Sequence, residues 1–253
     1  MSPDRYLSVV LGLITGSGFY DLPGIEEARS QEVGTEFGLV QITQGVWHGC
    51  PVAFLPRHGV GHRVPPHRIN YRANLQALHD VGVEAILATA VSGGINPKYR
   101  VGELVLIDQF IEFTHGRDHT FFDEEVRHTD MSDPYDSDLR RLLMETAVSE
   151  GIGLLDGGTY VCSNGPRFET AAEIQMYASF GGDLVGMTGY PEVALARELN
   201  LPYAAIGVVS NPAAGLSEKD LSLEEIWDVL EGLSTPVQQL LGGVSIRLAD
   251  RWK

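Results

Sequence analysis

Several short polar segments of this sequence combine residue types that could bind an anion. Gly16-Ser17-Gly18 follows an apolar stretch, and glycines at such a turn let backbone N–H groups and a hydroxyl approach the oxygens of a phosphate. A dinucleotide-binding fingerprint would need a further glycine three positions later, where the chain has Asp21. Taken alone, the turn is as compatible with an ordinary loop as with a phosphate site.

Arg57 and His58 are further candidate ligands for an anion. The planar guanidinium of Arg57 suits phosphate, and His58 would add a second donor. A solvated surface loop is the alternative interpretation of this stretch. His58, His62 and His67 fall close together, but no His-Glu-x-x-His spacing or cysteine pair accompanies them, so we expect no metal site.

Two other polar residues could bind the edge of a flat ring. Glu169 lies where the turn after Pro166 enters a helix, and its carboxylate could accept a ring N–H; favourable interaction with the helix N-terminus is the alternative. Asn211 precedes Pro212, where a turn is expected in any case. Its amide can both donate and accept, which suits the edge of a purine.

The elements that must position these residues alternate along the chain. Apolar, β-branched stretches predict strands at residues 7–14, 39–46, 52–55, 85–90, 104–110, 158–163, 183–187 and 203–210. Amphipathic spacing predicts helices at residues 70–81, 137–149, 170–180, 192–199 and 223–248. This order predicts an α/β fold with a mainly parallel sheet covered on both faces. Ligands bind such sheets at the carboxyl ends of strands, which is where Gly16, Ser92, Thr188 and Asn211 fall.

Composition restricts the class of protein. The chain has 253 residues, 43% of them apolar, and we interpret it as one domain over residues 1–253. A formal net charge of −16 argues against nucleic acid and anionic membranes as partners. No run of about 18 apolar residues predicts a membrane span, and no signal peptide is evident. Cys50 and Cys162 are expected to be buried free thiols, and we expect a cytoplasmic enzyme.

Together these segments resemble the trimeric purine nucleoside phosphorylase and methylthioadenosine phosphorylase family, over about residues 10–230. The resemblance is carried by Gly16-Ser17-Gly18, Arg57-His58-Gly59, residues 67–74, Asp108-Gln109-Phe110, residues 165–170 and residues 186–193. It implies the nucleoside phosphorylase fold, with a mixed, mainly parallel sheet flanked by helices. It also implies a homotrimer, with inorganic phosphate as co-substrate and no cofactor. The reaction would be phosphorolysis of a purine nucleoside to free purine and a ribose 1-phosphate.

Carried over position by position, the resemblance implies roles for individual residues. The phosphate site would consist of Ser17, Arg57, His58, the backbone at Val91 and the Thr188 hydroxyl. The nucleoside site would place Met187 by the ribose hydroxyls, Phe168 on the base, and Glu169 and Asn211 as the catalytic pair at the base edge. One departure is Ala90, which stands where relatives have a polar residue beside the phosphate. Only the backbone contribution of that loop can therefore be carried over.

Glu169 and Asn211 also bear on the base. The methylthioadenosine branch of the family has serine and aspartate at these two positions, whereas branches that act on inosine or guanosine keep glutamate and asparagine. A carboxylate at Glu169 accepts the N1–H of a 6-oxopurine, but it faces a lone pair in adenine. A missing matched hydrogen bond can cost several powers of ten in specificity. We therefore expect hypoxanthine or guanine as the base.

The 5′ substituent depends on the C-terminal region. Family members that prefer a 5′-hydroxyl carry a histidine there, and residues 221–226 contain none. Leu221, Leu223 and Ile226 could line a pocket for a methylthio group, although ordinary core packing of a helix fits the same spacing. The leading substrate is thus S-methyl-5′-thioinosine, and the chain resembles the bacterial methylthioinosine phosphorylases most.

Several alternatives stay open. Methylthioadenosine, or inosine and guanosine, could be the substrate instead. A nucleoside-binding protein without catalysis and a Rossmann-type dehydrogenase are the alternatives from other classes. The family also implies that a neighbouring subunit closes each 5′ pocket, and residues 115–135, which are rich in histidine and phenylalanine, would supply that segment.

Overall fold

The central strands of the sheet are buried on both faces. In this computed structural model, which describes residues 11–19, 22–59, 61–219 and 221–251, β1 (Leu11–Thr15) is buried along its whole length. It lies between β4 (Cys50–Pro56) and β5 (Ala85–Gly94), and both pairings are parallel. β5 also pairs in parallel with β11 (Tyr203–Pro212). Strands covered on both faces need continuous apolar sequence, which explains why these four were recognisable.

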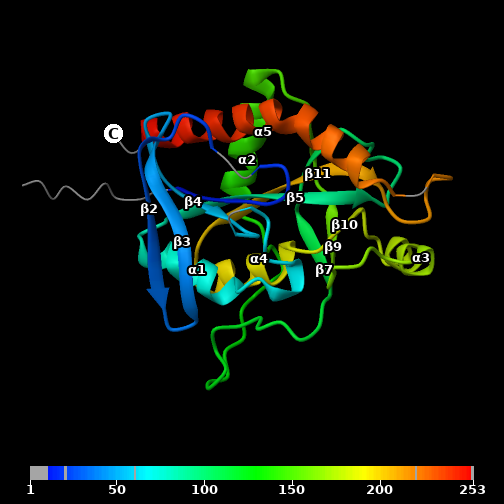
Figure 1. Cartoon of the computed structure of the whole chain (residues 1–253), viewed down its shortest axis with the longest axis horizontal. Coiled ribbons are helices and arrows are strands. Elements are labelled where there is room, and N and C mark those ends of the chain that lie inside the picture. Colours follow the sequence, from blue (N-terminus) through cyan, green and yellow to red (C-terminus); the bar gives the residue numbers. More distant parts are fainter. Residues whose placement is uncertain (1–10, 20–21, 60, 220, 252–253) are drawn as a thin grey trace, which may run out of the picture.

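The other strands extend this centre into one mixed sheet (Figure 1). They are β2 (Glu26–Thr35), β3 (Gly38–Trp47), β6 (Leu104–Leu106), β7 (Gln109–Phe113), β8 (Leu154–Asp156), β9 (Thr159–Ser163) and β10 (Leu184–Gly186). Within the described residues the main path runs β2-β3-β4-β1-β5-β10-β9-β7, and β11, β6 and β8 branch from β5. Six of the ten strand pairings are parallel, so the predicted mixed, mainly parallel sheet is confirmed.

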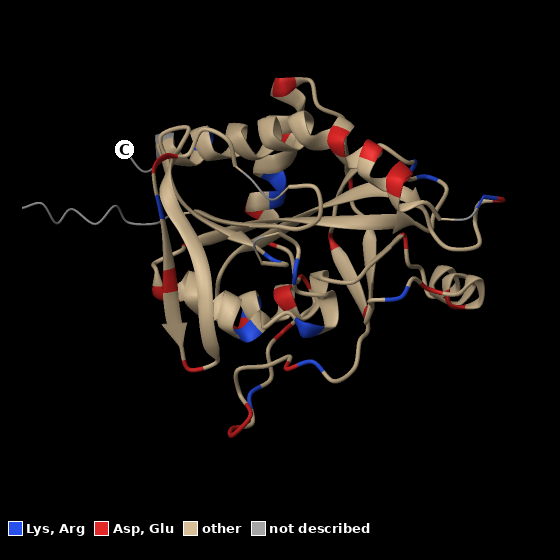
Figure 2. Ribbon diagram, viewed as in Figure 1, with Lys and Arg blue, Asp and Glu red and all other residues tan. Residues whose placement is uncertain are grey.

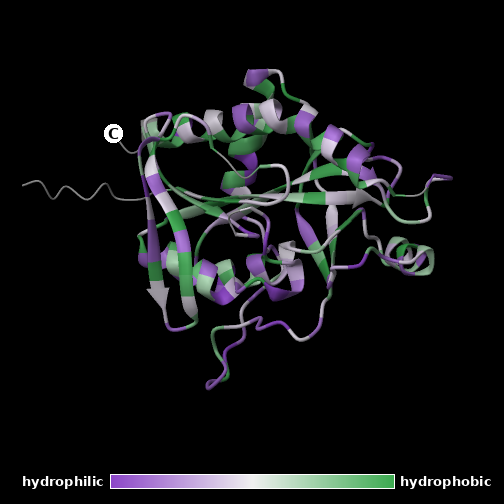
Figure 3. Cartoon of the chain, in the orientation of Figure 1, coloured by the Kyte–Doolittle hydropathy of each residue, from purple (hydrophilic) through white to green (hydrophobic). Residues whose placement is uncertain are grey.

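Helices cover both faces of the sheet. They are α1 (Tyr71–Asp80), α2 (Ser137–Glu150), α3 (Ala171–Ser179), α4 (Gly189–Glu198) and α5 (Leu223–Arg251), with a 3₁₀ turn at Pro66–Arg68. In Figure 1, α2 and α5 lie on one side of the sheet, α1 and α4 on the other, and α3 at the far end. The hydrophobic core divides in the same way, since one cluster contains residues of α1 and α4 and another those of α2 and α5. Figure 3 shows the apolar residues concentrated along the strands between these layers.

The structure differs from the sequence prediction at three strands. The strand expected at residues 104–110 is two strands, β6 and β7, because the chain changes partners at Asp108, whose carboxylate accepts the Gly158 N–H at 3.0 Å. β2 was not predicted: it pairs only with β3 and is exposed along most of its length, so it has no apolar alternation. β8 has three residues and was also missed. The strand expected at residues 7–14 begins outside the described residues.

Charge is spread over the exposed elements. Figure 2 shows acidic and basic residues interspersed on the helices and loops, with acidic residues at the start of α5, where Glu224 and Glu225 lie in the first turn. Among the described residues, no helix has the length and apolar content needed to cross a membrane. Cys50 and Cys162 are both free and buried, as expected.

Candidate active site

A single cavity gathers the residues that the sequence singled out. It has a volume of about 490 Å³ and opens where β1, β4, β5 and β11 end. All of the candidate residues line it: Ser17, Arg57, His58, Val91, Phe168, Glu169, Met187, Thr188, Asn211, Leu221, Leu223 and Ile226. The predicted convergence of the four segments is therefore present in the fold. A cavity of this size matches a small ligand that is held by a few polar groups.

The Gly16 turn lets an arginine approach the backbone. A Cβ atom at Gly16 would lie 3.0 Å from Arg57 Nη1, so a larger residue would push the guanidinium away. The Gly16 N–H points towards Thr89 Oγ1 at 3.4 Å, and Ser17, the next residue, lines the cavity. Glycine is needed here because Arg57 approaches the backbone closely; the approach of an anion, which the sequence pattern indicated, stays a prediction.

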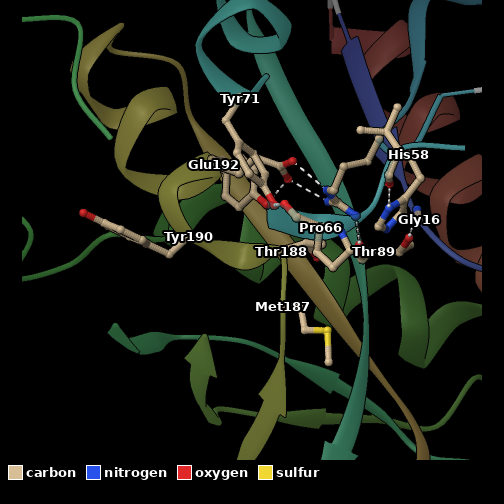
Figure 4. Close-up of polar contacts among 12 residues, drawn as sticks. Gly16, His58, Pro66, Tyr71, Thr89, Met187, Thr188, Tyr190 and Glu192 are labelled. Carbon is tan, nitrogen blue, oxygen red and sulfur yellow. Dashed lines mark hydrogen bonds and ion pairs between the residues drawn. The ribbon is translucent and has the colours of Figure 1, made fainter. Parts of the chain in front are cut away.

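Arg57 and Glu192 form a buried ion pair beneath the cavity (Figure 4). Nε and Nη2 of Arg57 donate to the two carboxylate oxygens of Glu192, both at 2.7 Å, and Nη1 donates to the Thr89 carbonyl at 2.8 Å. Tyr203 donates its hydroxyl to Glu192 at 2.7 Å. Burial alone would lower the pKa of Arg57, but the charge and hydrogen bonds of Glu192 raise that pKa above its ordinary value.

This pair changes the expected role of Arg57. The sequence interpretation gave its planar fork to phosphate, whereas the fork faces Glu192. A guanidinium has five N–H bonds, so one N–H on Nη1 and one on Nη2 remain for a ligand. Sequence reasoning missed Glu192, although it lies within the quoted segment 186–193; it was interpreted there only as part of a helix. Arg57 and Glu192 together carry no net charge.

His58 has the properties of an acceptor. Its ring is buried, and Nδ1 lies 2.9 Å from the Val64 carbonyl, which can only accept, so Nδ1 carries the hydrogen. Burial lowers the pKa of His58 to about 4, with further lowering by Arg57 and His62 and an opposing effect of the Val64 bond. The ring is therefore neutral at pH 7, and Nε2 has a free lone pair. The sequence predicts a donor at His58, whereas this tautomer offers an acceptor at Nε2.

Glu169 is available to a ligand because other residues complete the helix that follows. Thr170 is the N-cap of α3, and it forms a capping box with Glu173. The Ser163 hydroxyl donates to Glu169 at 2.5 Å, which directs the carboxylate. The alternative explanation for Glu169 was a favourable interaction of its carboxylate with the helix N-terminus. Glu173 makes that interaction instead.

The remaining polar residues lie around the same opening. Asn211 accepts from the Ser210 hydroxyl and donates one of its two amide hydrogens to the Pro212 carbonyl, both at 2.8 Å. Thr188 is buried at the N-cap of α4, and its side chain makes no capping bond. Its hydroxyl and the second amide hydrogen of Asn211 can therefore serve a ligand. Phe168 is 42% exposed at the rim, where a ring can stack on it.

The start of α5 forms the apolar end of the cavity. Leu221, Leu223 and Ile226 line it together with Trp227 and Leu230. Of the three predicted residues only Ile226 belongs to the hydrophobic core, together with Leu230, whereas Leu223 is 62% exposed, so core packing alone does not explain this spacing. Trp227 was missed, although its position four residues after Leu223 places it on the same helix face and could have identified it. Across the described residues, no group of three or more metal-ligating side chains occurs.

Comparisons with known proteins agree with this fold and cavity. The model of the phosphorylase superfamily matches residues 10–244, and the chain belongs to this family. It is 46% identical to the 6-oxopurine nucleoside phosphorylase of Pyrococcus furiosus, over 91% of this chain and 90% of that protein. It is 45% identical to a probable S-methyl-5′-thioinosine phosphorylase of Pseudomonas syringae, over 87% and 92%. The methylthioadenosine phosphorylase of Schistosoma mansoni, solved with adenine, superposes with a TM-score of 0.91 at 31% identity, covering 96% of this chain and 92% of that one.

Proposed function

We propose that this chain catalyses the reversible phosphorolysis of S-methyl-5′-thioinosine to hypoxanthine and 5-methylthioribose 1-phosphate. The observation that carries the proposal is the single cavity, which joins a polar anion-binding end, a carboxylate with an amide at a ring edge, and an apolar end formed by α5. Three ligand parts of different chemistry, phosphate, purine and methylthio group, match these three regions.

In the proposed complex, phosphate lies between the Gly16 turn and the N-terminus of α4. The hydroxyls of Ser17 and Thr188 and the free N–H bonds of Arg57 bind its oxygens, and the Val91 backbone contributes as well. His58 accepts the proton of the hydrogen phosphate at Nε2. Because Glu192 already balances the charge of Arg57, the bound phosphate keeps most of its own negative charge. An anion in this state is suited to stabilise a cationic ribose.

The chemistry then requires no covalent intermediate with the protein. Phosphate attacks the anomeric carbon while the C–N bond to the purine lengthens, so positive charge grows on the ribose and negative charge grows on the base. Asn211 donates an amide hydrogen to the departing base, and Glu169 accepts the N1–H of a 6-oxopurine. Phe168 stacks on the base and Met187 lies by the ribose hydroxyls. Aligned reactants and matched electrostatics both lower the barrier.

The base assignment has independent support from the relatives. Proteins named 6-oxopurine nucleoside phosphorylase and S-methyl-5′-thioinosine phosphorylase are 43–47% identical to this chain, and both names describe a 6-oxopurine. The structural neighbours named methylthioadenosine phosphorylase are 30–31% identical. Glu169 and Asn211 favour the same base, since a carboxylate and an amide complement N1–H and O6.

A second candidate is a 6-oxopurine nucleoside phosphorylase that acts on inosine or guanosine. It is favoured by relatives of that name at 46–47% identity. The two candidates differ only in the 5′ substituent. Leu223 and Ile226 favour the methylthio group, because their side chains offer a 5′-hydroxyl no hydrogen bond. His62, which also lines the cavity and whose ring lies 6.4 Å from that of Trp227, is the residue that would favour the hydroxyl.

A coupled assay tests both candidates. Release of free base is followed with and without phosphate, as hypoxanthine from methylthioinosine and inosine and as adenine from methylthioadenosine. We expect phosphate-dependent release that is fastest, as kcat/KM, with methylthioinosine. A preference for inosine would establish the second candidate, and a preference for methylthioadenosine would overturn the base assignment. Binding of the nucleoside without any release of base would indicate a binding protein.

Two features of the cellular form belong to the same proposal. A homotrimer is implied by the family resemblance, with residues 115–135 reaching a neighbouring subunit, and light scattering of the purified protein would test it. A cytoplasmic location is supported by the two buried free cysteines, since oxidising compartments favour disulfides.

A further inference from the structure

Arg117 is a buried arginine within a long loop. The loop connects β7 to α2 and runs below the sheet on the side of α1 and α4 (Figure 1). Most of its other charged residues are exposed, but Arg117 retains only 9% of its exposure. It does not line the cavity, and nothing in the proposed mechanism uses it.

The hydrogen bonds of Arg117 go to the backbone of the segments that form the cavity. Nη2 donates to the carbonyls of Asn164 at 2.9 Å and Met187 at 2.8 Å, and Nη1 donates to the carbonyl of Tyr190 at 2.6 Å. A longer contact of 3.4 Å joins Nη2 to the Ser163 carbonyl. One guanidinium thus connects the segment after β9 with the segment between β10 and α4.

Every acceptor that the described residues give Arg117 is uncharged. Besides the carbonyls, Nε points to Asn164 Oδ1 at 3.3 Å and Nη1 to the Tyr71 hydroxyl at 3.3 Å, while the guanidinium lies 5.3 Å from the centre of the Tyr71 ring. Burying a charge is costly unless it is compensated. Here several backbone dipoles compensate it, so the charge attracts both segments and adds to the pairing of β9 with β10 that already joins them.

The four carbonyls belong to the two segments that carry proposed ligand contacts. Ser163 directs Glu169 through its hydroxyl, and Asn164 precedes the turn that leads to Phe168. Met187 lines the cavity itself and precedes Thr188. The groups for the base and the ribose are therefore attached to the backbone that Arg117 holds. The Gly16 turn and the Arg57 loop, which serve phosphate, have no bond to Arg117 among those described.

We propose that Arg117 is a positioning residue that fixes the base-binding and ribose-binding segments relative to each other. This inference rests on the proposed phosphorolysis. Lysine cannot replace the function, because one ammonium lacks the planar arrangement of donors that reaches three carbonyls at once. Loss of Arg117 would let the two segments move apart, and a misplacement of about 1 Å can reduce the rate about 100-fold.

Steady-state kinetics of four proteins test the inference: the wild type, Arg117→Ala, Arg117→Lys and Arg72→Ala. Arg72 is the matched control, since it holds the same loop from outside through Asp118 at 2.9 Å and Asp123 at 2.5 Å. We expect Arg117→Ala to lower kcat/KM for the nucleoside about 100-fold. The KM for phosphate should rise less, because Thr188 lies between the held carbonyls of Met187 and Tyr190, whereas Ser17, Arg57 and His58 lie on other segments. Added guanidinium ion at millimolar concentration should restore part of the activity of Arg117→Ala and none to Arg117→Lys. Arg72→Ala should behave as the wild type.

Several results would overturn the inference. These are wild-type nucleoside kinetics in Arg117→Ala or Arg117→Lys, an equal loss in Arg72→Ala, or an equal rise in the KM values for both substrates without guanidinium rescue. If Arg117→Ala does not fold, Arg117→Lys carries the test, with a raised nucleoside KM at an unchanged melting temperature as the expected result. Absence of phosphorolysis in the wild type would overturn the proposed function instead. Nucleoside affinity, measured by calorimetry for the wild type and Arg117→Lys, would then decide whether Arg117 positions the site.

Discussion

Glu192 accepts two hydrogen bonds from Arg57 at 2.7 Å, and the two side chains are 0% and 1% exposed to solvent. The cavity that is proposed to bind phosphate therefore has a neutralised arginine in its floor. Attraction for the anion must come from single N–H and O–H dipoles, because α4 is not helical at Tyr190, its second residue.

Replacing Glu192 by glutamine should be strongly destabilising. The change leaves the guanidinium of Arg57 buried without its counter-charge, which typically costs about 3–5 kcal/mol. Urea unfolding measures this loss, and the KM for phosphate should rise as Arg57 loses its fixed orientation. Glu145→Gln is the control, because its partnership with Arg141 is exposed and such pairs contribute at most about 1 kcal/mol. If both variants showed a similarly small loss of unfolding free energy, the buried pair of Arg57 and Glu192 would not be important for stability.

His58 should make stability depend on pH below neutrality. Its pKa is lowered from 6.5 to about 4 by burial, so between these values the unfolded chain binds a proton that the folded chain does not. Unfolding free energy must then fall as pH falls, by about 2 kcal/mol from pH 7 to pH 5 for this group. Thermal unfolding at both pH values measures the difference. His58→Asn keeps a donor for the Val64 carbonyl but cannot titrate, so its unfolding free energy should fall less between pH 7 and pH 5. Identical pH profiles of unfolding free energy in the wild type and the variant would refute the lowered pKa of His58.

Asn211→Asp should shift the base preference towards 6-aminopurines. An aspartate accepts from an exocyclic amino group, which the amide hydrogens of Asn211 oppose. We expect the ratio of kcat/KM for methylthioadenosine over methylthioinosine to increase about tenfold or more, since loss of a matched hydrogen bond weighs heavily on specificity. The same coupled assay with both nucleosides measures the ratio. An unchanged ratio would count against recognition of the base edge by Asn211.

Ile226→Ala should distinguish the two candidate substrates. If Ile226 contacts a methylthio group, truncation lowers kcat/KM for methylthioinosine about tenfold and leaves inosine nearly unaffected. Both rates are measured on the same preparation, so the lost core packing of Ile226 affects them equally. Equal losses for the two nucleosides would favour the 6-oxopurine nucleoside phosphorylase that lacks a 5′ preference.

The predictable part of this fold was the part that is buried on both faces. Continuous apolar sequence predicts the strands β1, β4, β5 and β11. β2 could not be found in that way, because an exposed edge strand has no apolar pattern and depends on pairing with β3. The break between β6 and β7 at Asp108 could not be predicted either, because it arises from a hydrogen bond between the Asp108 carboxylate and the Gly158 N–H.

The candidate site, too, could be predicted only in part from the sequence. Ser17 and Glu169 follow strands, and Asn211 lies near the end of β11 rather than in the turn that the sequence predicts, so topology alone brings them to one cavity. The orientation of each group depends on partners far away in sequence, which spacing does not indicate. Glu192 lies 135 residues from Arg57, and Tyr190 lies 73 residues from Arg117. Sequence patterns can therefore identify the members of such a site but not the direction in which their donors point.

The capping box between Thr170 and Glu173 has a consequence for how this family could diversify. Because these two residues begin α3 without help from Glu169, position 169 can change its side chain without unravelling the helix behind it. A substitution there alters the chemistry presented to a purine at little cost in folding. Natural variation between nucleobases is thus open to single, structurally mild steps, and laboratory selection for a new base would do well to begin at this position.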